Sequence, residues 1–269
     1  EQPAVQEGKF VEEVVVTAQK REENVQEVPV AMSALTGDDL GVIMTAGPDI
    51  RFLSARVPSL MLESSFGRAF PRFYMRGLGN TDFDLNASQP VSMVVDEIVL
   101  ENPVVKGMPL FDLDRVEILR GPQGTLFGRN TPAGVVKFDT VKPTKEFDAN
   151  FRVSYGSFDT IDINGGVGGP ITDTLAYRFS ALYQSQSDWV DNKYEAGPEK
   201  ALGGYDNLAY RLQFLFEPNE DFSALFNVHG WSIDGTARIF RANIIKQGSN
   251  QLSDWFEQDE VWQDGRNKQ

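Results

Sequence analysis

The sequence predicts an α+β domain over its first half, followed by antiparallel strands of a transmembrane β-barrel over its second half. Short β-rich runs alternate with candidate helices up to about residue 143. From about Asp148 onward, apolar and polar residues alternate with a period of two, as on the two faces of a sheet. No run reaches the 18 or so apolar residues that a membrane-spanning helix requires, so a membrane role has to use strands.

The composition excludes several classes of function. The 269 residues carry 25 Lys and Arg against 39 Asp and Glu, a net charge of −14, which makes nucleic acid an unexpected partner. There is no cysteine and a single histidine, so disulfide frameworks, thiol chemistry and zinc sites of the Cys/His type are excluded. We expect no cofactor and no metal site. A chain that is 41% hydrophobic can bury a core.

Short strands and helices are predicted in order along the first half. Strand-like runs rich in β-branched residues occupy 14–16, 28–32 and 91–95. A helix is predicted to begin at 36–39, whose two aspartates suit a helix N-terminus, and a second one follows 47–49, with proline at an early helical position.

The second half is predicted to form strands with one aromatic-rich face and one polar face. The predicted strands cover 151–155, 161–167, 175–183, 208–216 and 222–228. In the fourth of these, Leu208 and Tyr210 share a face that excludes Arg211 and Gln213. Tight turns at 168–173 and 218–221 alternate with a long polar connection between the third and fourth strands. This alternation favours an outer-membrane barrel over a soluble β-sandwich.

The strongest local motif is the segment 113–136, LDRVEILRGPQGTLFGRNTPAGVV. Its four glycines and two prolines require tight turns between two β-rich runs. It is not a phosphate-binding loop, because no Gly-Lys-Ser/Thr follows and no helix start is evident after the glycines. The glycine run 165–169 is not a dinucleotide fingerprint either, since Pro170 and a turn follow where a helix would begin.

This segment resembles the plug-domain signature of TonB-dependent outer-membrane receptors. Residues 11–18 look like the TonB box of that family, Arg76-Gly77 matches the Arg-Gly of its plug, and 90–99 matches its V-x-V-D-G strand, except that Glu97 stands where glycine is usual. The resemblance implies a periplasmic segment with the TonB box over 1–18, a plug domain over 19–143, and about the first five strands of the barrel, with their loops, over 144–269.

The family fold is a 22-stranded barrel whose lumen holds the plug. Twenty-two strands need roughly 200 residues in strands alone, more than follow residue 143. We therefore expect the N-terminal part of a longer receptor.

The N-terminal segment is the candidate partner site. A run of β-branched residues suits pairing with the edge of a partner's sheet. The resemblance implies that this partner is TonB, powered by the ExbB–ExbD complex. The alternative is an ordinary edge strand of the plug. The candidate box residues are Glu13, Val14, Val15, Val16, Thr17 and Ala18.

Three arginines, Arg76, Arg120 and Arg129, are candidates for locking the plug in the barrel, because a guanidinium pairs bidentately with carboxylates. The resemblance supports Arg76 and Arg120 in this role, whereas Arg129 is equally readable as an ordinary solvated arginine.

Substrate contacts are expected from outward-facing loops in which aromatic residues are interleaved with amide and charged groups. The alternative is that these are ordinary solvated loops. For Trp189 and Tyr194, a further alternative is a place in the interfacial aromatic girdle. The candidates are Phe66, Arg68, Arg72, Asn80, Asp82, Phe83, Asp84, Asn86, Trp189 and Tyr194. His229 lies on the polar side of the fifth strand and is expected to be structural.

The expected function is TonB-dependent import of a scarce small molecule across the outer membrane of a Gram-negative bacterium, in contact with outer-membrane lipid. An iron-siderophore is the first candidate, and an oligosaccharide or other organic nutrient the alternative. A passive or adhesive surface barrel with a retained plug is the rival from another class. No enzymatic activity is expected, because no spacing of carboxylates indicates a glycoside hydrolase.

Overall fold

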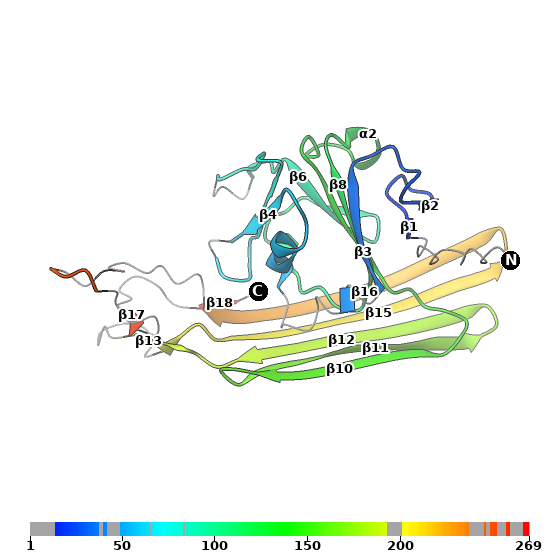
Figure 1. The fold of residues 1–269 in the computed structure, drawn as a ribbon. Helices are drawn as coiled ribbons and strands as arrows, with labels where there is room; N and C mark the ends of the chain where they lie inside the picture. The colour runs from blue at the N-terminus through cyan, green and yellow to red at the C-terminus, as the bar shows by residue number, and fades with distance from the viewer. Residues whose placement is uncertain are drawn as a thin grey trace, which may run out of the picture.

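The chain folds into a small mixed domain that lies against one face of a sheet of long strands (Figure 1). We call the domain the plug and the sheet the wall. The computed structural model describes residues 14–37, 40–41, 49–64, 66–82, 84, 86–192, 201–236, 245, 248–251, 257–258 and 266–268.

A five-stranded sheet forms the centre of the plug. Its strands, in spatial order, are β3 (Met32–Thr36), β8 (Leu113–Arg120), β9 (Gly134–Thr140), β6 (Val91–Val95) and β7 (Ile98–Leu100). Strands β6 and β9 are parallel, and the other neighbours are antiparallel. The smaller elements are β1 (Val15–Val16) paired with β2 (Glu23–Asn24), β4 (Leu60–Glu63) paired with β5 (Arg72–Met75), the 3-10 helices η1 (Ile50–Ala55) and η2 (Val105–Gly107), and the short helix α2 (Gly124–Phe127).

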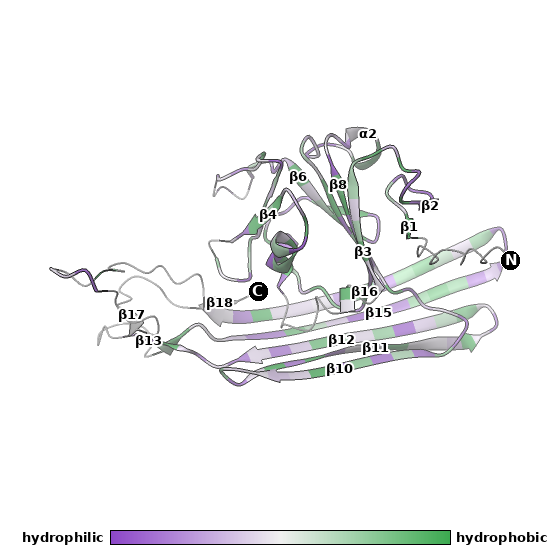
Figure 2. Cartoon of the chain, viewed as in Figure 1, coloured by the Kyte–Doolittle hydropathy of each residue, from purple (hydrophilic) through white to green (hydrophobic). Residues whose placement is uncertain are grey.

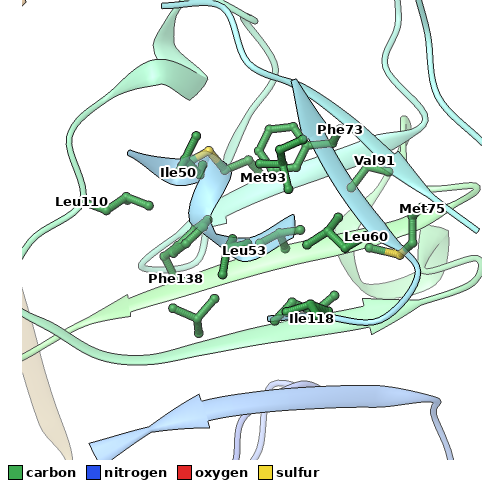
Figure 3. Packing of buried hydrophobic residues seen from close by; sticks show 14 of the residues in the cluster. Ile50, Leu53, Leu60, Phe73, Met75, Val91, Met93, Leu110, Ile118 and Phe138 are labelled. Carbon is green, nitrogen blue, oxygen red and sulfur yellow. The ribbon is translucent and has the colours of Figure 1, made fainter. Parts of the chain in front are cut away.

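Both faces of the plug sheet are covered, so its central strands are buried almost without interruption. Met93, Ile118 and Phe138 point into a core completed by Leu53 and Phe73 from η1 and β5 (Figure 3). On the opposite face, a second cluster gathers Val94, Leu119 and Val135 from the sheet with Ala18 and Phe127. Ala18 shows that the segment following β1 is part of the plug's own packing.

The wall is an antiparallel meander. Its strands are β10 (Asp148–Gly156), β11 (Thr160–Thr172), β12 (Leu175–Gln186), β15 (Tyr205–Asn219) and β16 (Phe222–Thr236), with β18 (Arg266–Lys268) paired to the far end of β16. A separate small sheet consists of β14 (Ala201–Leu202), β13 (Val190–Asn192) and β17 (Glu257–Gln258). The predicted strands of the second half are confirmed, each of them longer than predicted.

Polar and apolar residues alternate along the wall strands, as predicted (Figure 2). On β15, Leu208 and Tyr210 are 53% and 48% exposed, whereas Arg211 and Gln213 are buried against the plug. Phe151 on β10 is 76% exposed. The wall therefore presents an apolar face outward and a polar face to the plug, which is the arrangement of an outer-membrane barrel strand.

Among the described residues, no helix is long and apolar enough to cross a membrane.

Two local predictions need correction. Residues 28–31 are not a strand; the strand begins at Met32, because a proline inside 28–31 cannot donate to a ladder. The helix expected after 47–49 is the short 3-10 helix η1, capped by Asp49, whose carboxylate accepts from the Arg51 N–H at 2.8 Å. The helix start predicted at 36–39 agrees with the structure, in which Gly37, Leu40 and Gly41 are helical; residues 38–39 and 42–48 lie outside the described part of the chain.

The expected alternation of short turns and long loops holds only in part. Strands β10 and β11 are joined by just Ser157 to Asp159, at the same end of the wall as the long connection 187–204. Phe158 and Asp159 have φ angles of 58° and 52°, as required at the two central positions of a type I′ turn. Phe158 packs against Trp189 of the long connection, with ring centroids 5.7 Å apart.

Candidate functional site: the plug–wall interface and the docked N-terminal segment

The plug is fixed to the wall through one buried carboxylate, Asp112, which directly precedes β8. Its side chain is fully buried and accepts from Arg178 Nε at 2.6 Å, from Arg178 Nη2 at 2.7 Å and from Asn150 Nδ2 at 2.9 Å. The Ser180 hydroxyl also donates to it. Burial alone would raise the pKa of Asp112, but the hydrogen bonds from Arg178, Asn150 and Ser180 hold it below its usual value. Arg178 reaches Asp148 at 2.7 Å as well.

The wall leaves room for this carboxylate at a glycine. A Cβ on Gly166 would lie 2.6 Å from Asp112 Oδ2 and 2.9 Å from Arg178 Nη2, so any side chain there collides with the ion pair. Arg211 of β15 completes the site by donating to the carbonyls of Phe111 and Asp112 at 3.1 and 3.0 Å. We call this set of wall residues around Asp112, drawn from β10, β11, β12 and β15, the Asp112 socket.

Two further contacts join the plug to the same wall. The guanidinium of Arg68 lies 3.6 Å from the ring centroid of Tyr205 and donates to Gln184 at 3.1 Å. Gln213 donates to the Thr140 hydroxyl at 3.2 Å. Burial lowers the pKa of Arg68. The plug thus contacts the wall along much of the length of its strands.

The N-terminal segment 14–18 is docked on the plug sheet rather than extended into solvent. Val16 and Ala18 are 0% and 1% exposed. The Thr17 N–H donates to Glu117 Oε1 at 2.6 Å, and the Thr17 hydroxyl accepts from Lys137 Nζ at 2.5 Å. Burial raises the pKa of Glu117.

Charged neighbours surround this contact. Lys137, only 1% exposed, also reaches Asp139 Oδ2 and Glu97 Oε1, both at 2.9 Å. Burial works against its charge, but the hydrogen bonds to Asp139 and Glu97 raise the pKa of Lys137 above its ordinary value. Arg115 donates to the Val15 carbonyl at 3.2 Å. A hollow of about 540 Å³ opens beside this group.

The candidate TonB box is therefore an edge strand in this structure, and its pairing with a partner stays a prediction. Among the described residues, Val15 and Val16 pair with Asn24 and Glu23 alone, and the Val14 carbonyl accepts from the Val25 N–H at 2.9 Å. Glu13 lies outside the described residues.

The three predicted lock arginines lie away from the wall strands of this chain. Arg120 donates to Ser33 Oγ at 2.6 Å and to the Pro58 carbonyl at 3.3 Å. Burial, and then the nearby charge of Arg76, lower the pKa of Arg120. Arg76 and Arg129 are exposed. Within the described ranges none of the three forms an ion pair with a carboxylate, so their locking role stays a prediction.

The substrate-contact candidates do not converge on one site. Arg72 is buried and pairs with Glu63 at 2.7 Å, which makes it part of the plug's own packing. The loop residues Asn80, Asp82, Asp84 and Asn86 form a series of side-chain-to-backbone turns. Phe83 and Tyr194 lie outside the described residues.

The remaining candidates lie near the end of the wall that carries the long connection. Phe66 is 40% exposed and Trp189 36%. Beside them, a polar hollow of about 240 Å³ is lined by Arg51 and Arg68 of the plug together with Tyr205 and its neighbours in the wall. Of the predicted residues that the structure describes, Arg68 alone lines this hollow.

Comparison with known proteins agrees with this architecture. The sequence model of the TonB-dependent Receptor Plug Domain matches residues 24–135. This part of the chain is therefore similar to the plug domain of TonB-dependent receptors. The pesticin receptor of Yersinia pestis is 29% identical over 133 residues, which cover 49% of this chain and 19% of that receptor. A vitamin B12 transporter of Vibrio vulnificus is 21% identical over 228 residues, 82% of this chain and 35% of the transporter.

Solved structures of similar fold cover a larger part of the chain than the plug alone. The crystal structure of the ferric yersiniabactin uptake receptor of Yersinia pestis superposes with a TM-score of 0.69 and 22% identity, over 77% of this chain and 32% of that one. The chain thus spans about a third or less of these relatives. Its plug and wall have the fold of the corresponding part of a plugged outer-membrane barrel.

The sequence reasoning missed Asp112, Arg178 and Arg211. A signal was present, because an arginine on the polar face of a strand whose other face is aromatic has to be paired inside the barrel. Nothing in the sequence connects Arg178 to Asp112, 66 residues away.

Proposed function

We propose that this chain is the plug and first wall strands of an active importer that takes a ferric siderophore across the outer membrane. TonB, energised by the ExbB–ExbD complex, would pull on Glu13–Ala18 and so remodel the plug. The outer membrane has no nucleotide energy source of its own, so an energised partner has to act through an accessible segment. The proposal is transport rather than catalysis, in keeping with the transport receptors that the chain resembles.

The observation that carries the proposal is the position of segment 14–18. It forms a short edge strand whose backbone is held by few hydrogen bonds. In Figure 1, β1 and β2 lie toward the end of the wall that carries the two-residue turns between β11 and β12 and between β15 and β16. In outer-membrane barrels the short turns are on the periplasmic side. A partner that adds this segment to its own sheet edge would reach it from that side.

The ferric siderophore is supported by the likeness to the yersiniabactin uptake receptor. An organic nutrient is the second candidate, favoured by the likeness to a vitamin B12 transporter. The polar hollow beside Arg68 and Tyr205 lies where either would first meet the plug. A passive or adhesive barrel is the rival that uses no energy.

The test is uptake by cells that carry the full-length receptor with residues 11–18 deleted. We expect uptake of an iron-55-labelled siderophore to fall to the level of a tonB-deficient strain, while the receptor still reaches the surface and folds. Uptake that persists without these residues would refute energised import and favour a passive barrel. Uptake of labelled cobalamin or oligosaccharide, but not of siderophore, would keep the mechanism and change the substrate.

A further inference from the structure

We propose that Thr17, Lys137 and Glu97 form a clasp that keeps segment 14–18 docked on the plug, and that Glu97 sets how often this segment is released. The inference rests on the proposed function in one respect, because the released segment is taken to be the part that TonB binds. The clasp itself is a statement about docking, and it can be measured without a partner.

The first argument is that the polar attachment of the segment converges on one point. Strand β1 has only two residues, and its partner β2 follows it closely in the sequence and is not part of the plug sheet. The bonds to the plug sheet are those of Thr17 to Glu117, Asp139 and Lys137, and of the Val15 carbonyl to Arg115. A segment held at so few places opens locally at a small free-energy cost.

The second argument is that Lys137 has a complete set of partners only while the segment is docked. An ammonium group has three donors. Those of Lys137 reach Thr17 Oγ1, Asp139 Oδ2 and Glu97 Oε1 at 2.5, 2.9 and 2.9 Å. Because the hollow of about 540 Å³ lies beside the group, water can replace Thr17 when the segment leaves. The contact is therefore reversible, unlike the fully enclosed contact of Asp112 with Arg178.

The third argument is that Glu97 contacts Lys137 from the solvent-exposed side, and that it does so with its backbone in an unfavourable conformation. Glu97 has a φ of 70°, in the left-handed region that favours glycine, and its side chain is 49% exposed. It reaches Lys137 at 2.9 Å and Lys20, three residues past Thr17, at 3.9 Å. One carboxylate thus bridges the sheet lysine and Lys20, which lies just after the segment. Replacement of Glu97 by glycine suits the backbone and removes only this bridge.

The experiment follows release of the segment in the full-length receptor in lipid bilayers. Val16 is fully buried when docked, and no cysteine occurs in residues 1–269, so Val16→Cys reports release through its rate of maleimide labelling. Cysteine packs as a small hydrophobe at such a site. Background labelling is taken from the parent receptor without the new cysteine.

In the Val16→Cys background, Glu97→Gly and Glu97→Gln are expected to raise the labelling rate by about threefold, as loss of a partly exposed ion pair predicts. Lys137→Met is expected to raise it by about tenfold or more, because it removes charge-assisted hydrogen bonds. Glu22→Gln is the matched control, since Glu22 lines the same hollow and carries the same charge. It should leave the rate within about twofold of the parent.

Labelling of the Glu97 variants at the parental rate would overturn the clasp. If Lys137→Met does not fold, Glu97→Gly still decides, because glycine at a φ of 70° carries no folding penalty. Capture of the same variants by the periplasmic domain of TonB separates the two proposals. Faster labelling without stronger capture supports the clasp and overturns TonB as the partner, whereas unchanged labelling with capture intact overturns the clasp and keeps the partner.

Discussion

The Asp112 socket gives the sharpest quantitative prediction. The change is Asp112→Asn, which keeps the volume of the side chain and removes its charge. The carboxylate now receives two bonds from Arg178 at 2.6 and 2.7 Å and one from Asn150 at 2.9 Å, in full burial. Breaking a buried ion pair from one side costs about 3–5 kcal/mol. Arg178 keeps Asp148, so we take the lower end, about 3 kcal/mol, which is about 150-fold in an equilibrium constant.

The assay is native-state hydrogen exchange of the full-length receptor, read at the amides of β8 and at Val141, whose N–H donates to the Asp112 carbonyl at 3.1 Å. Asp114→Asn is the matched control. Asp114 pairs with Arg115 at 2.8 Å, but its side chain is 48% exposed, and we expect a loss below about 1 kcal/mol. Exchange rates in Asp112→Asn within about twofold of those in Asp114→Asn would refute the view that the socket holds the plug.

Three further outcomes are expected. Gly166→Ala should mimic Asp112→Asn in the exchange assay, because its Cβ would lie 2.6 Å from the Asp112 carboxylate; protection equal to the parent would contradict this. Burial lowers the pKa of Lys106 to about 8, so between about pH 8 and 10.5 the unfolded plug binds more protons than the folded plug. The free energy of unfolding should therefore rise over this pH range in the parent but not in Lys106→Met. Urea-unfolding free energies that change with pH in the same way in both proteins would contradict this prediction. Tyr210→Arg places a charge on the outward face and should cost about 2–4 kcal/mol of folding free energy in bilayers, whereas an arginine is native one residue later; unchanged folding midpoints would mean that this face does not meet lipid.

The architecture could be predicted from the sequence because each part leaves a periodic or conformational trace. The wall strands alternate over more than ten residues, and the two environments, lipid and plug, differ enough to impose that alternation. The plug motif places glycines where the backbone needs them, as at Gly121 and Gly128, whose φ angles are 98° and 77°. Errors occurred where the pattern was short: the strand over 28–32 included a proline, and the turn at 157–159 contains no glycine.

The contacts between the parts could not be predicted in the same way. The resemblance supported Arg76 and Arg120, and Arg129 was chosen only because a guanidinium can pair with carboxylates; within the described residues none of the three pairs with a carboxylate, so their locking role stays a prediction. Asp112 and Arg178 had no motif, since an ion pair across 66 positions depends on how the plug is seated, which no local pattern encodes. The accommodating Gly166 was noticed only as part of a glycine run, although its role is to leave space for the carboxylate.

The Asp112 socket and the clasp at Thr17 differ in their access to water. This difference predicts which of the two contacts is stronger. At the Asp112 socket both partners are sealed, so separation leaves a buried guanidinium without its main counter-charge. At the clasp, Glu97 is half exposed and a hollow borders Lys137, so solvent compensates for each lost bond. A force applied to the N-terminus therefore meets its weakest resistance at Thr17, and segment 14–18 should leave the plug while Asp112 still holds β8 and β9 against the wall. Exchange of the β8 amides that rises together with labelling at Val16, in the same variant, would show that the two attachments open as one unit and that this ordering is wrong.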